Sequence, residues 1–225
     1  MKGKSNMLYL HGFANTFFEG SKKVKAFSKY YNVIPYSYDS SRKHDDILND
    51  MSKFVKENNI KIVSGVSLGG FFAMELSEKH NLYSVTLNPS NNPQKSLKRF
   101  LGEVHSFKAN KYFNFTKEIL NSYPTKLPNG FGLVMLKEND KIISSEETKK
   151  MLPKSYKSIT VPGDDHGFKD IENYADLIRR EHILHNKEQT KIKFFEEKKI
   201  KGDKECEKLS TYTDFHHRLM LPVGR

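Results

Sequence analysis

The 225-residue sequence contains few cysteines and no long apolar run. Its one cysteine, Cys206, cannot form an internal disulfide, which agrees with a reducing compartment. No apolar run reaches the roughly 18 residues that a membrane-spanning helix needs. The first apolar stretch ends at His11 and is too short for the core of a signal peptide. We therefore expect a cytoplasmic protein without a membrane span.

Acidic residues are fewer than basic ones, and the formal net charge is +11. Such a charge could indicate binding to nucleic acid, to an anionic membrane surface or to an acidic substrate. Lysine greatly outnumbers arginine, however, whereas sites that recognise phosphates and bases favour the guanidinium group. The absence of tryptophan, with abundant asparagine, isoleucine and tyrosine, indicates a general compositional bias. We therefore expect a solvated charged surface and no nucleic-acid partner.

Two apolar spacings alternate along the first half of the chain. Compact apolar runs favour strands, and apolar residues at three-to-four spacing favour amphipathic helices. The pattern predicts strands at 7–10, 32–36, 60–64 and 83–87, with helices at 19–31 and 45–57. Pro35 cannot donate to a sheet ladder, so the second strand is expected at an edge. This alternation indicates an α/β fold with a mostly parallel sheet and helices on both faces.

Residues 90–128 lose this regularity and carry scattered aromatic residues among lysines and asparagines. A stretch of this length between strands is usually a lid or cap over a site. Its aromatic residues fit either the core of such a cap or contacts to a ligand. We therefore predict a small cap-like insertion at about 90–128.

Regularity returns in the last part of the chain. Strands are predicted at 132–136 and 158–161, with a helix that Ser144 or Ser145 can cap and a final helix at 171–184. Beyond about His185 charged residues dominate, which favours a short peripheral helix or a flexible tail. We therefore predict one domain over 1–186 and a charged C-terminal extension over 187–225 whose role stays open.

Ser67 lies in the motif Gly65-Val66-Ser67-Leu68-Gly69, between a predicted strand and an apolar helical pattern. A serine raised on a tight strand-to-helix turn needs glycines on both sides, because a Cβ atom there would collide with the strand or the helix. The start of the helix also presents free N–H groups that favour developing negative charge. The motif therefore predicts a nucleophile elbow.

A nucleophilic serine needs a base within hydrogen-bond reach and an acid that orients the base. Asp140 follows the predicted strand at 132–136, and His166 follows the strand at 158–161. Both fall where ligands bind in parallel sheets, beyond the carboxyl ends of the strands. Their order after Ser67 is serine, acid, histidine, as nucleophile-elbow folds require. Other carboxylates, Glu138, Asp164 and Asp165, compete with Asp140 for the acid role.

Five separated motifs resemble those of the small bacterial YqiA-like esterases of the α/β-hydrolase fold. They are Leu8-Tyr9-Leu10-His11-Gly12-Phe13-Ala14, the elbow from Gly65 to Ala73, Asn88-Pro89, Asn139-Asp140-Lys141-Ile142 and Gly163-Asp164-Asp165-His166-Gly167-Phe168. The resemblance runs from about Met7 to Ile183. It implies a compact α/β-hydrolase fold and hydrolysis of acyl esters or acyl-CoA thioesters. It also implies a triad of Ser67 as nucleophile, Asp140 as orienting acid and His166 as base.

The expected mechanism adds an oxyanion hole made by the backbone N–H groups of Phe13 and Leu68. Motif support is expected from four residues that shape the surrounding turns: His11, Gly12, Gly65 and Gly69. No cofactor or metal is expected, because five further histidines lack cysteine or carboxylate partners at metal-ligand spacing. These histidines are His105, His182, His185, His216 and His217.

One departure from the family pattern is Asp164, which stands where the family usually has glycine and places a negative charge beside the base. The expected partner is a small-molecule acyl ester or thioester. Two alternatives remain: the same triad could transfer the acyl group to another acceptor or cleave an amide, or the fold could serve as a binding module without catalysis. The acyl length, the leaving group and the oligomeric state stay open.

Overall fold

The computed structural model describes residues 3–17 and 20–200. Its contacts divide the chain into two units, residues 1–179 and residues 180–225, with the boundary inside the last helix, α7 (Ala175–Ile200). The first unit contains the sheet and the predicted site residues. Cys206, His216 and His217 lie outside the described residues.

A parallel sheet of six strands forms the centre of the first unit. Its order is β2-β1-β3-β4-β7-β8. The strands are β1 (Asn6–Leu10), β2 (Asn32–Tyr36), β3 (Ile62–Val66), β4 (Tyr83–Leu87), β7 (Phe131–Lys137) and β8 (Tyr156–Val161). Every neighbouring pair in this sheet is parallel. The predicted α/β class is therefore confirmed, and the strand that contains Pro35 lies at an edge as expected.

Helices cover both faces of the sheet. On one face, α1 (Lys22–Ser28) and the 3₁₀ helix η2 (Ile171–Asn173) pack with the start of α7 against alternate strand residues such as Met7 and Val85. On the other face, α2 (His44–Glu57) and α3 (Leu68–His80) pack against Leu8 and Val63. A further helix, α6 (Ser145–Met151), follows β7. The two-residue period of the strands thus divides the apolar side chains between two cores.

Helix ends differ from the sequence expectations at two places. The helix predicted at 19–31 is α1, which is shorter at both ends. It begins only after Ser21, and at its other end Tyr30 and Tyr31 form a closing turn. The final helix, predicted to end at 184, is instead α7, which begins at Ala175 and continues to Ile200. The reason is that this stretch of lysine, glutamate and other helix-forming residues contains no glycine or proline that could end a helix.

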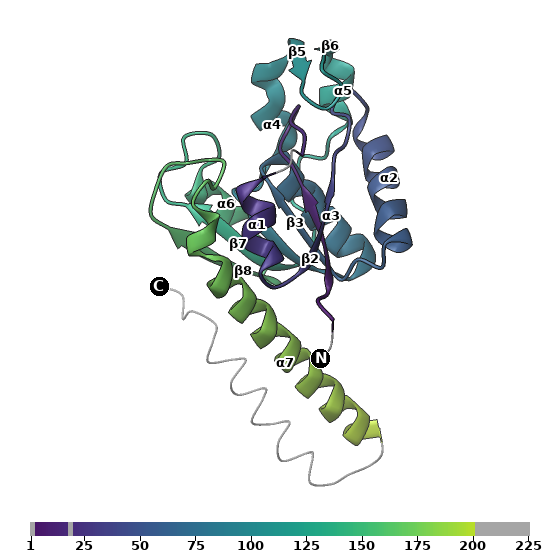
Figure 1. Ribbon diagram of the computed structural model, residues 1–225, viewed down its shortest axis with the longest axis vertical. Helices are drawn as coiled ribbons and strands as arrows, with labels where there is room; N and C mark the ends of the chain where they lie inside the picture. Colours follow the sequence, from purple (N-terminus) through teal and green to yellow (C-terminus); the bar gives the residue numbers. More distant parts are fainter. Residues whose placement is uncertain (1–2, 18–19, 201–225) are drawn as a thin grey trace. The chain divides into compact units, whose positions relative to one another are not determined.

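The segment between β4 and β7 contains helices and a hairpin of its own. It comprises α4 (Pro93–Leu97), the 3₁₀ helix η1 (Lys98–Phe100), the antiparallel pair β5 (Gly102–Ser106) and β6 (Lys111–Phe115), and α5 (Lys117–Ser122). Figure 1 shows α4, α5, β5 and β6 together at one end of the sheet. Leu97, Phe115 and Leu120 from this segment are buried against α2 and α3. We refer to residues 90–128 as the cap segment.

Within the described residues, none of the helices combines the length and the apolar character that a membrane crossing requires.

Candidate active site

Ser67 lies in the turn between β3 and α3, with φ 55° and ψ −122°. Few residues other than glycine adopt a positive φ, and such strain is held by surrounding bonds. The Ser67 N–H donates to the Leu87 carbonyl at 3.0 Å, and its carbonyl accepts from Phe71 and Ser90 at 3.1 and 3.0 Å. The backbone of Ser67 is therefore fixed by β4, by the turn after β4 and by α3.

Two glycines of the motif permit this turn because backbone lies where a side chain would stand. A Cβ atom on Gly65 would lie 2.2 Å from the Gly69 carbonyl oxygen, and one on Gly69 would lie 2.3 Å from the His11 carbonyl oxygen. Both distances are too short for non-bonded atoms. Gly65 thus allows α3 to approach β3, and Gly69 allows α3 to approach the end of β1.

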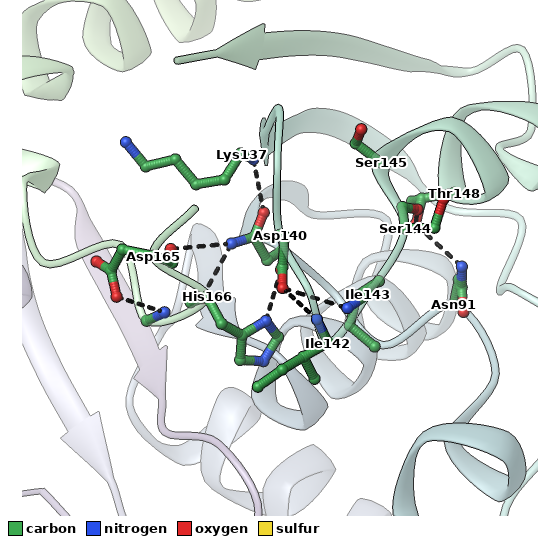
Figure 2. Close-up of polar contacts among 12 residues, drawn as sticks. Asn91, Lys137, Asp140, Ile142, Ile143, Ser144, Ser145, Thr148, Asp165 and His166 are labelled. Carbon is green, nitrogen blue, oxygen red and sulfur yellow. Dashed lines mark hydrogen bonds and ion pairs between the residues drawn. The ribbon is translucent and has the colours of Figure 1, made fainter. Parts of the chain in front are cut away.

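His166 and Asp140 meet at the carboxyl ends of β8 and β7. The His166 Nδ1 atom lies 2.6 Å from Asp140 Oδ2, and the Asp140 side chain is completely buried. The other oxygen, Oδ1, accepts from the N–H groups of Ile142 and Ile143 at 2.8 and 3.3 Å. Figure 2 shows this carboxylate between the imidazole ring and the two backbone donors. Asp140 can therefore orient the ring of His166 while its own charge is satisfied by the loop.

The rival carboxylates have different surroundings. Asp165 Oδ1 accepts from the Gly167 N–H at 3.1 Å, and Oδ2 accepts from the Lys169 N–H, so its side chain closes its own turn. Asp164 is exposed. Within the described residues, Asp140 is hydrogen-bonded to the imidazole of His166, whereas Asp164 and Asp165 are not.

Asn88, which directly follows β4, stabilises the loop that carries His166 through hydrogen bonds. The Asn88 Nδ2 group donates to the carbonyl of His166 at 3.0 Å, and its Oδ1 accepts from the Lys137 N–H at 2.8 Å. One amide side chain thus connects the ends of β4 and β7 to the loop between β8 and η2, residues 162–170, which we call the histidine loop. The sequence places Asn88 at the correct edge, but gives no sign that its side chain has this role.

Lys137 is the second support of the histidine loop. Its ammonium donates to the Pro162 carbonyl at 3.0 Å and to Asp170 Oδ2 at 2.7 Å, and its side chain is 2% exposed. It also lies 5.0 Å from the centres of the Phe168 and Tyr174 rings. Burial disfavours its charge, but the hydrogen bond and the charge of Asp170 outweigh burial and raise the pKa of Lys137. A lysine after a buried strand normally suggests a solvated residue, so the sequence carries no signal for this contact.

Ser67 and His166 both line one cavity of about 620 Å³. No hydrogen bond joins their side chains in the described part of the chain, although catalytic contacts in ligand-free sites are often long and tighten only when substrate binds. Phe13 and Phe100 provide part of the apolar wall, with ring centres 5.0 Å apart. Phe100 belongs to the cap segment, whose Phe115 and Tyr123 are buried instead. The cap segment thus contributes both core residues and cavity wall.

The predicted oxyanion donors lie beside Ser67. Leu68 is the first residue of α3, so its N–H has no partner within the helix. Phe13 follows Gly12, on which a Cβ atom would lie 3.6 Å from the Cβ of Ser67, and both residues line the cavity. The turn after β1 therefore runs directly along the serine.

His11 is buried and supports this turn. Its Nε2 accepts from the Tyr38 N–H at 3.2 Å, which leaves Nδ1 protonated to donate to the Gly12 carbonyl at 2.7 Å. The ring stacks on Tyr38 with centres 4.3 Å apart. Burial lowers the pKa of His11 to about 4, so the ring is neutral at pH 7. His11 thus shapes the loop that presents Phe13.

In the described residues, histidine, cysteine and carboxylate side chains do not gather in groups of three or more that could hold a metal ion.

Comparisons with known proteins identify the fold. The model of the uncharacterised protein family UPF0227 matches residues 6–180. A UPF0227 protein of Shewanella woodyi is 29% identical over 157 residues, which cover 67% of this chain and 84% of the relative. Among solved structures, Est1E from Butyrivibrio proteoclasticus has a TM-score of 0.64 at 13% identity, covering 82% of this chain and 89% of that one.

Alpha/beta hydrolase domain-containing protein 10 from mouse has a TM-score of 0.58 at 15% identity, and the match covers 83% of this chain and 92% of that one. At these identities the solved structures report on the fold alone. They confirm the α/β-hydrolase fold that the motifs predicted.

Proposed function

The chain belongs to the uncharacterised protein family UPF0227, the YqiA-like family that its motifs resemble, and on this premise we propose that it is a serine hydrolase of acyl esters or thioesters. The proposal assigns Ser67 as the nucleophile, His166 as the base and Asp140 as the acid that orients the base. It assigns the backbone N–H groups of Phe13 and Leu68 to the oxyanion hole.

One observation carries this proposal. The imidazole of His166, whose Nδ1 lies 2.6 Å from the buried Asp140, lines the same cavity as Ser67 on its elbow. With Nδ1 engaged by the carboxylate, Nε2 is the nitrogen that can accept a proton from a serine hydroxyl. If His166 were an ordinary surface residue and Ser67 part of an ordinary turn, there would be no reason for a buried carboxylate beside the imidazole or for a cavity that both residues line.

The reaction then proceeds in two halves. His166 takes the proton of Ser67 as the serine oxygen attacks the acyl carbon, and the oxyanion is held by the N–H groups of Phe13 and Leu68. His166 returns the proton to the leaving alcohol or thiol, and the acyl group remains on Ser67. Water, deprotonated by His166, then attacks the acyl carbon; the bond to the Ser67 oxygen breaks, His166 returns the proton to that oxygen, and the carboxylic acid is released.

We take an ester as the proposed substrate class, which agrees with the names of two proteins that share the fold, an esterase domain from Rhodothermus marinus and a monoacylglycerol lipase from Paleococcus ferrophilus. The choice between an oxygen ester and an acyl-CoA thioester belongs to the same proposal. A paired measurement with 4-nitrophenyl butyrate and butyryl-CoA would decide between them.

The decisive experiment is labelling with a fluorophosphonate probe, which reacts only with an activated serine. We expect the wild-type chain to be labelled and to hydrolyse 4-nitrophenyl esters, and Ser67→Ala to lose both. The control is Ser96→Ala, which removes another hydroxyl that lines the cavity. An unlabelled, inactive wild-type protein would favour the binding module, and a labelled S67A variant would exclude Ser67 as the nucleophile.

A further inference from the structure

The wall of the cavity around Ser67 is positively charged. Four basic residues line it, namely Lys22, Lys23, Arg99 and Lys169, and no aspartate or glutamate among the described residues does so. The other lining residues are neutral, apart from the two histidines already discussed. A substrate in this cavity therefore meets positive charge and no described carboxylate.

The four cations are not equivalent. Lys22 pairs with Glu172 at 3.9 Å, and the guanidinium of Arg99 lies 4.8 Å from the centre of the Phe100 ring. No carboxylate oxygen of the described residues lies within salt-bridge distance of the Lys23 or Lys169 ammonium. Among the residues that the structure describes, these two lysines therefore line the cavity without a direct counter-ion.

Lys23 is the more constrained of the two. It is partly buried at the start of α1, and burial lowers the pKa of its ammonium. The charges of Lys169 and Lys22 act in the same direction, while Asp165 and Glu172 partly oppose them. A bound anion would offset this cost, since an opposite charge nearby favours the charged form of a group.

The position of Lys169 relates this charge to one end of the substrate. Lys169 lies on the histidine loop, three residues after His166, and Gly167 of the same loop also lines the cavity. In the proposed mechanism His166 gives its proton to the leaving group, so the leaving group must lie beside this loop. The cavity also has an apolar wall. Phe13 contributes to it from the turn after β1, and Leu97 and Phe100 contribute from the cap segment.

We propose that the enzyme selects esters whose leaving group carries an anionic substituent, a carboxylate or a phosphate, which Lys23 and Lys169 bind. This inference rests on the proposed hydrolase function and specifies the substrate class of the same site. The apolar wall on the cap side would then accept a short acyl chain. The anionic substituent would then lie near the oxygen or sulfur atom of the leaving group. It would leave the site with the alcohol or thiol, of which it is a part.

The test compares acetyl esters that differ only in the leaving group. The substrates are the acetates of 4-hydroxybenzoate, of its neutral methyl ester and of 4-hydroxyphenyl phosphate, each rate being divided by its spontaneous hydrolysis rate. A fourth and a fifth substrate, phenyl hemisuccinate and its methyl ester, place the charge on the acyl side instead. The carboxylate and phosphate arms distinguish the two sources of negative charge.

For the wild-type enzyme we expect kcat/KM to favour an anionic leaving group over the neutral one by about tenfold, the effect of one partly screened charge. The preference should shrink as salt is added, because screening weakens exposed pairs. Lys23→Gln and Lys169→Gln should each lower the ratio of anionic to neutral kcat/KM. Lys61→Gln is the matched control. Lys61 is exposed and precedes β3, so it lies at the amino ends of the strands, away from the carboxyl ends that carry the cavity.

Each other outcome has a distinct meaning. Equal turnover of neutral and anionic esters, unchanged by K23Q, would overturn the inference and leave the hydrolase function intact. A preference for the hemisuccinate over its methyl ester, without one for anionic leaving groups, would show that the charge is bound on the acyl side and overturn the assignment. Absence of turnover and of fluorophosphonate labelling would reject the proposed function itself.

Discussion

Two histidines near Ser67 show how surroundings decide the role of one residue type. His11 is buried and neutral. Its Nδ1 donates to the Gly12 carbonyl and its Nε2 accepts from the Tyr38 N–H, so neither nitrogen is free for a proton transfer. His166 is bonded at Nδ1 by a carboxylate and its side chain is 19% exposed. Only His166 therefore keeps a nitrogen for a base role. The residue type alone does not distinguish the two.

The acid role can be tested by Asp140→Asn. In the proposed mechanism the carboxylate orients the ring and stabilises the imidazolium, so we expect kcat for a 4-nitrophenyl ester to fall by about 10³ to 10⁴. The asparagine can still accept from the N–H groups of Ile142 and Ile143, so the melting temperature should change little. Steady-state kinetics and thermal unfolding of the same sample separate the two effects.

The matched control for this variant is Asp164→Asn. Asp164 is exposed on the histidine loop, so its removal should leave kcat within about threefold, as for other surface substitutions. If instead D164N loses activity while D140N keeps it, the acid role belongs to Asp164. The sequence leaves this choice open, because Asp140 competes with three other carboxylates that follow the last two strands, and only the folded loops separate them.

At the scale of elements, the histidine loop depends on Lys137 at the end of β7. Lys137→Met would keep much of the side-chain volume but remove the donors to the Pro162 carbonyl and to Asp170. We expect a loss of about 2 kcal/mol of unfolding free energy from these charge-assisted hydrogen bonds. We also expect kcat to fall about tenfold with little change in KM, because small displacements of a catalytic group are costly.

Urea unfolding and steady-state kinetics measure these effects, and Lys150→Met, exposed on α6, is the control. Lys137→Arg should restore part of the stability, because a guanidinium can donate to the same two acceptors. A K137M protein that unfolds like the wild type and keeps its kcat would show that Asn88 alone positions the loop.

A second element contact makes stability depend on pH. His44 of α2 is hydrogen-bonded through Nε2 to Glu75 of α3 at 2.8 Å and through Nδ1 to Asp45 at 2.8 Å. Burial would lower the pKa of His44, but the two carboxylates outweigh burial and raise it above its ordinary value of 6.5. A raised pKa stabilises the fold fully below about pH 6.5, and this contribution is lost as the pH rises through the folded-state pKa.

We therefore expect the urea midpoint of the wild type to fall as the pH rises above neutrality, and His44→Gln to lack this fall. The control is His80→Gln, since burial lowers the pKa of His80 and its titration acts in the opposite direction. A wild-type midpoint with the same pH dependence as that of H44Q would contradict this contribution from His44.

The elements themselves were mostly predictable, for reasons that particular segments make clear. The strands β1, β3 and β7 are compact, buried apolar runs, and Ser144 caps α6 through the Glu147 N–H as expected. The hairpin of β5 and β6 was not foreseen, because its residues alternate weakly and lie among lysines. The sequence predicts a helix that ends at 184, but α7 continues to Ile200, because its charged residues are good helix formers and no glycine or proline interrupts them.

At the scale of the whole molecule, the proposed triad is assembled by topology. Ser67, Asp140 and His166 follow β3, β7 and β8, and the parallel order of the sheet brings the carboxyl ends of these strands to one edge. The sequence predicts this location, because each of the three residues follows a predicted strand and ligands bind beyond the carboxyl ends of parallel strands. It could not predict the supports of Asn88 and Lys137, because such contacts depend on side-chain packing between loops that are far apart in the chain.

The same topology leads to an expectation about the C-terminal extension. Both faces of the sheet are covered by residues up to Ile178, and among the described residues no later one belongs to an apolar core cluster. The site residues also precede this position. We therefore expect a chain that ends at residue 186 to keep its melting temperature within about 3 °C, since the lost contacts should be worth less than about 1 kcal/mol.

A chain that ends at residue 174 is the informative contrast. It lacks Ala175 and Ile178, which are 1% and 0% exposed, and removing a buried isoleucine alone costs about 2–5 kcal/mol. We expect this shorter chain to unfold or aggregate, while the longer truncation keeps the ester hydrolysis and the fluorophosphonate labelling that we propose for the full chain. Loss of folding in the chain that ends at 186 would mean that residues 187–225 complete the domain, because the core that ends at Ile178 would then be insufficient by itself.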